Sequence, residues 1–210
     1  NKNSEINLID AVLEPIKKIK KLEVVIGNVG LFKILVDCLE LPARWKLRLV
    51  RHFSRREYFE DLLKRLETNY DLDQQTIHVD TKRLEDLKKI DSNQVIGGRA
   101  ISEIVQRFEK KLKDPRDDYR GKKNVKIIRD YLKINLSIKK TEKAIISFFA
   151  NNSLKNTNLN IYLKKINFIN KKLGKKYSIY FKTNFGRNTE YYTGTVFLAF
   201  VKNKSKTIEI

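Results

Sequence analysis

Leu22-Glu23-Val24-Val25-Ile26 is a short apolar run, and Gly27-Asn28 follows it directly. Valine and isoleucine favour the pleated, packed surface of a sheet, so the run predicts a buried strand. Gly27 and Asn28 end the strand, and Asn28 is a good N-cap for a following helix. The sequence therefore predicts a strand, a tight turn and a helix that Pro42 ends.

Other strand signals lie at the far end of the chain. After Gly174 the apolar period changes from helical to alternating. We expect strands over 177–182, 191–201 and 207–210, arranged as an antiparallel meander. A lone strand over 22–26 has no partner, so these distant segments must join it in one sheet.

The segment between these strands is helical in pattern, apart from a polar stretch over 71–80 that we expect to be irregular. Pro115 and Gly121 bracket a loop inside it. The fourfold spacings that indicate helices are Trp45, Leu49 and Phe53, then Tyr58, Leu62 and Leu66. We therefore expect an α+β fold in three parts: a first α/β portion over 1–41, a helical insertion over 42–174, and antiparallel strands over 175–210.

Composition limits the class of protein. The 210 residues include 41% apolar side chains, enough to bury a core, and no apolar run reaches the roughly 18 residues that span a bilayer. One Cys excludes an internal disulfide, and with two His it cannot form an ordinary structural zinc site. We expect a cytoplasmic protein without a membrane segment. No Met occurs, so we expect that Asn1 is not a translation start and that the sequence is processed, cropped or a fragment.

The net charge of +20 raises the question of nucleic-acid binding. Residues 1–150 carry 33 basic and 23 acidic side chains, and residues 151–210 carry 12 and 2. Lysines over 164–176 form a stripe on a predicted helix. A solvated face in a lysine-rich protein explains it more simply than RNA contact, which we keep as an alternative.

Conventional catalytic patterns are absent from the sequence. His52 and His78 have no paired nucleophile nearby, and Cys38 lies on the apolar side of its helix. Gly97-Gly98 lacks the Lys-Ser/Thr or third Gly of a phosphate loop, so we interpret it as a turn before a helix. We expect no catalytic residue, no metal and no cofactor.

One cluster is denser in chemistry than a core strand requires: Phe185-Gly186-Arg187-Asn188-Thr189-Glu190-Tyr191-Tyr192-Thr193-Gly194-Thr195-Val196-Phe197. A guanidinium holds a carboxylate or phosphate by two parallel hydrogen bonds. Tyrosine hydroxyl groups can form hydrogen bonds with a polar ring, and the tyrosine rings can form the sides of its pocket. Strand alternation would place Tyr191 and Tyr192 on opposite faces, so only one reaches a pocket. This set of side chains suits a small zwitterionic ligand. The alternative is an edge strand whose aromatic side chains simply pack against their neighbours.

The same cluster resembles the histidine-binding motif of histidyl-tRNA synthetases and of the regulatory subunit of ATP phosphoribosyltransferase. The common form reads Arg-Gly-Leu-Asp-Tyr-Tyr-Thr-Gly; here Arg187, Tyr191, Tyr192, Thr193 and Gly194 match, and 188–190 depart. Three upstream blocks resemble the regulatory branch: Gly27-Asn28-Val29-Gly30-Leu31-Phe32, Leu41-Pro42-Ala43-Arg44-Trp45 with the basic helix through Phe53, and Ile96-Gly97-Gly98-Arg99.

The resemblance implies a partial class II aminoacyl-tRNA synthetase-like antiparallel sheet with a large helical insertion. It also implies a noncatalytic regulatory subunit in a hetero-oligomer with the catalytic short-form ATP phosphoribosyltransferase, at the first step of histidine biosynthesis, with L-histidine as effector. Arg187 would take the ligand carboxylate and Tyr192, or else Tyr191, the imidazole; Glu190 would pair with Arg187 or face the ring. The alternative is a fragment of a histidyl-tRNA synthetase that activates histidine with ATP.

Overall fold

The computed structural model of the chain describes residues 4–68, 74–112, 118–186, 194–202 and 207–209. Its centre is a five-stranded sheet in the order β4-β5-β1-β6-β7. The strands are β1 Leu22–Asn28, β4 Asn135–Ser137, β5 Ser178–Lys182, β6 Thr195–Lys202 and β7 Thr207–Glu209. Segments from both ends of the sequence thus share one sheet, as predicted.

The order of the strands corrects the expected meander. β1 lies between β5 and β6, pairing in parallel with β5 and antiparallel with β6, so β5 and β6 are not neighbours. β6 and β7 do form the expected antiparallel pair. The burial of Val24, Val25 and Ile26 agrees with this central position, because neighbouring strands on both edges of β1 shield its side chains from solvent.

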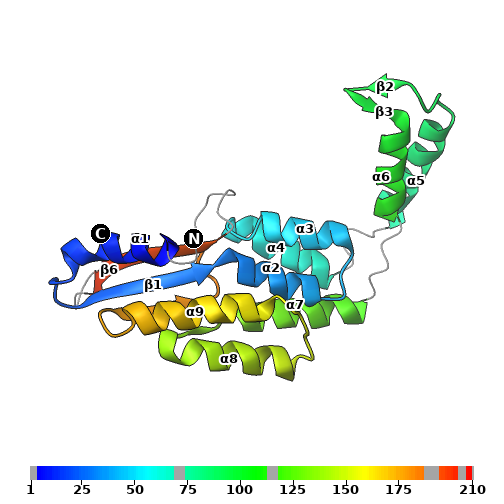
Figure 1. The fold of residues 1–210 in the computed structure, drawn as a ribbon. Coiled ribbons are helices and arrows are strands. Elements are labelled where there is room, and N and C mark those ends of the chain that lie inside the picture. The colour runs from blue at the N-terminus through cyan, green and yellow to red at the C-terminus, as the bar shows by residue number, and fades with distance from the viewer. Residues whose placement is uncertain (1–3, 69–73, 113–117, 187–193, 203–206, 210) are drawn as a thin grey trace.

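Helices cover one face of the sheet and share one core with it (Figure 1). Leu22, Val24 and Ile26 of β1 point into this core, as do Ile179 and Phe181 of β5. The helices that contribute to it are α1 Ser4–Leu13, α2 Val29–Cys38, α3 Ala43–Arg51, α4 Arg56–Glu67, α7 Asp118–Leu132, α8 Ile138–Asn151 and α9 Leu159–Leu173. We call this assembly the body. It has the expected α+β class, with one parallel strand pair in an otherwise antiparallel sheet.

Local sequence explains the element boundaries in the body. The Asn28 side chain accepts a hydrogen bond from Leu31 N at 3.1 Å and caps α2, as predicted. α1 ends at Leu13, and a 3₁₀ turn over Glu14–Ile16 contains Pro15. Two details differ from expectation. Tyr58 is 38% exposed and its neighbour Phe59 takes the buried position, and the short strand β4 gave no signal of its own.

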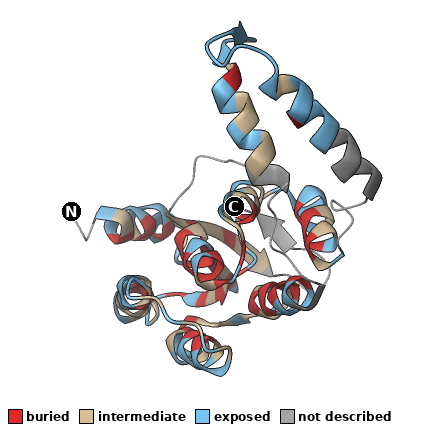
Figure 2. Cartoon of the chain, turned by 90° about the vertical axis from the view of Figure 1, so that its right-hand side faces the viewer, coloured by how far each residue is buried: buried red, intermediate tan, exposed pale blue. Residues whose placement is uncertain are grey.

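Residues 74–112 form an arm that projects from the body (Figures 1 and 2). It consists of α5 Gln74–Lys88, the hairpin strands β2 Val95–Ile96 and β3 Arg99–Ala100, and α6 Ile101–Leu112. The expectation of an irregular 71–80 is wrong for 74–80, because no Gly or Pro interrupts this polar segment and α5 packs against α6. Gly97 and Gly98 have φ of +58° and +77° and make the hairpin turn.

Candidate functional site

The residues predicted to hold a ligand, Arg187, Glu190, Tyr191 and Tyr192, lie outside the described residues. The structure does describe the residues that flank them, and these define where the segment 187–193 is attached. Gly186 precedes the segment and Gly194 follows it. We call 187–193 the binding segment.

Both flanks of the binding segment meet at Val29, the first residue of α2. The Gly194 carbonyl accepts a hydrogen bond from Val29 N at 3.4 Å. At the other flank, a Cβ added to Gly186 would lie 3.2 Å from Phe53 Cε1 and 4.0 Å from Val29 Cγ2. The two sequence blocks that carried the resemblance, 27–32 and 186–197, are therefore neighbours in space.

Gly27 and Asn28 strengthen this attachment. A Cβ on Gly27 would lie 2.3 Å from the carbonyl oxygen of Phe185, so only glycine permits this approach of the two backbones. The buried Asn28 donates from Nδ2 to Thr195 Oγ1 at 3.2 Å while its Oδ1 caps α2. The Asn28 side chain thus connects the end of β1 and the start of α2 to Thr195, which follows the binding segment.

Glu5 of α1 holds the start of β6 from a second side. Its Oε1 accepts a hydrogen bond from Thr195 N at 3.1 Å, and its Oε2 lies 3.2 Å from Lys165 Nζ on α9. Partial burial opposes ionisation of Glu5, but the Thr195 and Lys165 contacts outweigh it and hold its pKa below the usual value. Glu5 is therefore a carboxylate at neutral pH.

An open hollow of about 560 Å³ lies on the sheet face that the helices leave uncovered. Val25 pairs with Tyr180 and with Leu198 across the strands, and these side chains point to that face. The lining also contains Phe185, whose carbonyl meets Gly27, so the hollow reaches the attachment of the binding segment. The full lining is Glu23, Val25, Arg56, Asn135, Tyr180, Lys182, Asn184, Phe185, Leu198 and Phe200. We call it the sheet-face hollow.

The chemistry of the sheet-face hollow suits a small polar molecule with an unsaturated ring. Tyr180, Phe200 and Phe185 supply aromatic surface, while Glu23 and Lys182 supply opposite charges. Its volume falls in the range of ordinary small-molecule sites, about 300–1,000 Å³. Sequence reasoning missed these residues. Alternation in β5 separated Ile179 and Phe181 from Tyr180 and Lys182, but it did not show which face stays uncovered.

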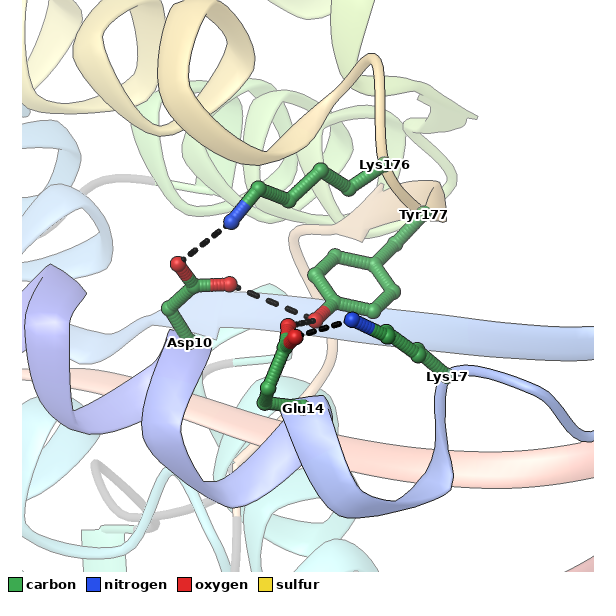
Figure 3. Close-up of polar contacts among 5 residues, drawn as sticks. All are labelled: Asp10, Glu14, Lys17, Lys176 and Tyr177. Atoms are coloured by element: carbon green, nitrogen blue, oxygen red, sulfur yellow. Dashed lines mark hydrogen bonds and ion pairs between the residues drawn. The ribbon is translucent and has the colours of Figure 1, made fainter.

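A polar cluster fastens α1 to the end of α9 (Figure 3). Asp10 pairs with Lys176 at 2.7 Å, and Glu14 pairs with Lys17. The Tyr177 hydroxyl lies 3.3 Å from Asp10 Oδ1 and 3.4 Å from Glu14 Oε2, so the two carboxylates share one hydroxyl proton. Burial and then Asp10 raise the pKa of Tyr177 to about 12. These contacts fix α1, and with it Glu5, against the turn between α9 and β5.

Three further residues were weighed from the sequence as candidates for catalysis, His52, Cys38 and His78, and the structure describes the contacts of the first two. His52 makes an edge contact with Tyr58, with ring centroids 4.6 Å apart. Cys38 packs partly buried against the core, and burial raises the pKa of its thiol. His78 falls among residues whose side chains are not described. Within the described ranges, no group of three His, Cys, Asp or Glu is placed to hold a metal ion.

The lysine stripe over 164–176 is partly neutralised. Lys165 pairs with Glu5 and Lys176 with Asp10, both from α1. Lys172 lies over the Phe168 ring, 5.9 Å from its centroid. Two of the six lysines thus form ion pairs with α1, which weakens the stripe as an RNA surface.

In the part of the chain that the structure describes, no helix is both long enough and apolar enough to span a membrane.

Comparisons with known proteins support the resemblance drawn from the sequence. No family model matches the chain. An ATP phosphoribosyltransferase regulatory subunit from Rhizobium rhizogenes is 27% identical over 201 residues, covering 89% of this chain and 53% of that protein. The chain thus spans about half the length of this curated relative.

A solved structure shares the fold. The crystal structure described as an ATP phosphoribosyltransferase regulatory subunit/histidyl-tRNA synthetase from Bacillus halodurans aligns with a TM-score of 0.53 at 13% identity. The alignment covers 99% of this chain and 41% of that one. The fold is therefore that of the histidyl-tRNA synthetase-like class II proteins, and both similarities confirm the sequence-based resemblance.

Proposed function

We propose that the protein is a noncatalytic regulatory subunit of ATP phosphoribosyltransferase, which assembles with the catalytic short-form subunit and transmits feedback inhibition by histidine. It would thereby serve the first step of histidine biosynthesis. The similarity over 89% of the chain to a protein named as such a subunit supports the proposal. The observation that carries it is the meeting of 27–32 and both flanks of the binding segment at Val29, beside the sheet-face hollow.

In this proposal histidine binds between the binding segment and the sheet-face hollow. Arg187 takes the carboxylate, and Tyr192, with Tyr191 as the second choice, contacts the imidazole. Glu190 pairs with Arg187 or faces the ring. Tyr180 and Glu23 in the hollow offer further polar contacts to a ligand that extends over the sheet.

Inhibition requires that histidine binds two states of the complex with different affinity. The attachment of the binding segment offers a physical route for such a difference. Val29 starts α2, so a ligand that moves either flank of the segment acts on the start of a helix that contributes to the core. A change there passes into the core of the body and so reaches the complex with the catalytic subunit.

Calorimetric titration with histidine tests the site. The full-length protein should bind histidine, and Arg187→Ala should weaken binding by about tenfold or more, the loss expected for a charge-assisted pair. Arg51→Ala, an exposed arginine on α3, is the matched control and should bind as wild type. Equal binding by wild type and Arg187→Ala would contradict the assignment of Arg187.

Histidine-dependent ATP–pyrophosphate exchange separates the proposal from its alternative. A regulatory subunit should show none, with or without the catalytic subunit. Exchange by the protein alone would instead identify a histidyl-tRNA synthetase, in which Arg187 acts in catalysis.

A further inference from the structure

The arm has a hollow of its own. Arg99 of β3 and Ile104, Arg107 and Phe108 of α6 line an open depression of about 260 Å³, which we call the arm hollow. Arg99 and Arg107 are exposed, and neither makes a hydrogen bond or ion pair with the described residues. Nearby charges differ in this respect, because Lys88 pairs with Glu109 at 2.8 Å and Lys89 with Asp86 at 3.0 Å.

Apolar surface accompanies these two cations. Ile104 and Phe108 are only half-buried within the arm hollow. On the adjoining hairpin, Val95 is 63% and Ile96 49% exposed. The arm hollow therefore combines two arginines that have no ionic partner among the described residues with partly exposed apolar side chains, and it lies next to the exposed apolar side chains of the hairpin. Such a combination marks an interaction surface, because it contributes little to folding of the arm itself.

The charges select the kind of partner. Residues 74–112 contain eight Lys or Arg and six Asp or Glu, so the arm lacks the dense positive charge of an RNA-binding surface. A second copy of this chain is a poor partner, because each copy carries a formal charge of +20. A guanidinium is weakly hydrated and pairs with carboxylates in a two-pronged geometry, which suits a protein interface. The surface therefore fits another protein that presents carboxylates next to an apolar side chain.

We propose that the arm hollow docks the catalytic ATP phosphoribosyltransferase subunit, through one or two carboxylates on Arg99 and Arg107 and an apolar side chain on Ile104 and Phe108. This inference rests on the proposed function, since it names the surface by which the two subunits meet. It places subunit contact on the arm and histidine recognition on the body.

The test is a titration of the full-length protein with the catalytic subunit of the same organism. Arg99→Glu/Arg107→Glu should weaken the dissociation constant at least tenfold. Lys82→Glu/Arg83→Glu, an equal change of charge on exposed α5 residues of the same arm, should leave it within about twofold. Thermal unfolding of both variants should match wild type, since all four side chains are exposed. Histidine binding should be unchanged in both variants.

Each result has a distinct meaning. No binding by wild type overturns the proposed function and the docking surface with it. Binding by wild type with equal affinity of both double variants overturns the docking surface alone, as does an equal loss in both, which would reflect net charge. Loss of RNA binding in Arg99→Glu/Arg107→Glu with subunit binding intact would also overturn it, and would assign the arm hollow to nucleic acid.

Discussion

The body and the arm contain similar kinds of residue but differ in how far they bury the apolar ones. In the body, helices and a sheet share one continuous core, and large side chains such as Trp45 and Phe32 are wholly buried. In the arm, Leu84 and Ile101 are buried, while Val95 and Ile96 of the hairpin are exposed (Figure 2). Few of the side chains that the structure describes in the arm are buried, so these residues contribute little to stability. The body therefore gains stability from one shared core, whereas the described part of the arm leaves apolar side chains exposed.

A pair of phenylalanine truncations gives the largest expected difference between the two regions. Phe32→Ala removes a ring stacked on Phe53 at 4.2 Å and should lower the free energy of unfolding by about 3–5 kcal/mol. Phe108→Ala in the arm should cost less than about 1 kcal/mol, since this ring is half-buried. Denaturant unfolding measures both. Similar losses would show that the arm contributes to stability as much as the body does.

Two substitutions of glycine by alanine should destabilise the protein for different reasons. Gly27→Ala places a methyl group against the carbonyl of Phe185 and should destabilise the body by about 2 kcal/mol while weakening histidine binding. Gly98→Ala meets no atom within 4 Å, but φ of +77° strains it by about 1 kcal/mol, and only the arm should respond. Hydrogen exchange can localise each effect. Unchanged histidine affinity in Gly27→Ala would show that the close contact between Gly27 and Phe185 has no influence on the histidine site.

The contacts of α1 give a smaller, pH-dependent effect. The Lys176 contact holds the pKa of Asp10 below its usual value, and Lys17 does the same for Glu14. Carboxyl groups with lowered pKa stabilise the fold above their unfolded pKa values, near 4, and this contribution is lost as pH falls through the lower folded values. Tyr177→Phe removes the shared hydroxyl and should cost about 1 kcal/mol at neutral pH.

Unfolding measured from pH 6 to pH 2 checks this expectation. Wild type should lose stability below pH 4 more steeply than Asp10→Asn, in which one of these carboxylates cannot be protonated. Parallel curves for the two proteins would mean that the cluster in Figure 3 contributes nothing to the fastening of α1.

The smallest effect concerns an imperfection inside the body. The Tyr131 hydroxyl is buried and has no hydrogen-bond partner among the residues that the structure describes, and burial raises its pKa. Tyr131→Phe removes the unpaired group and keeps the ring, so stability should stay equal or rise by up to about 1 kcal/mol. A loss above 1 kcal/mol by thermal unfolding would show that the hydroxyl has a partner such as buried water.

Much of the fold could be predicted because local signals and burial agree in the body. Val24 and Ile26 indicated the strand, and Asn28 the cap of α2. The position of β1 between β5 and β6 was not predicted. An apolar pattern shows which face of a strand is buried, but it does not show which strands lie next to it. The helical 74–80 escaped for a related reason, since a polar helix that packs on one partner has a weak apolar period.

The candidate site was predicted only in part. Arg187 and the two tyrosines came from a local motif, and their ligand roles stay predictions. Val29 and Glu5, which attach the flanks of the binding segment, are far from it in sequence and gave no chemical signal. Arg99 was noted as part of the Ile96-Gly97-Gly98-Arg99 block, but its lack of an ionic partner among the described residues became visible only once the surrounding charges were placed.

The most direct test of the account is the steady-state activity of the catalytic subunit, measured with and without this protein across a range of histidine concentrations. The account predicts that the protein raises the activity, that histidine inhibits the assembled complex, and that Arg187→Ala keeps the activation while losing at least tenfold in sensitivity to histidine. Activity and inhibition that are the same with or without this protein would contradict it.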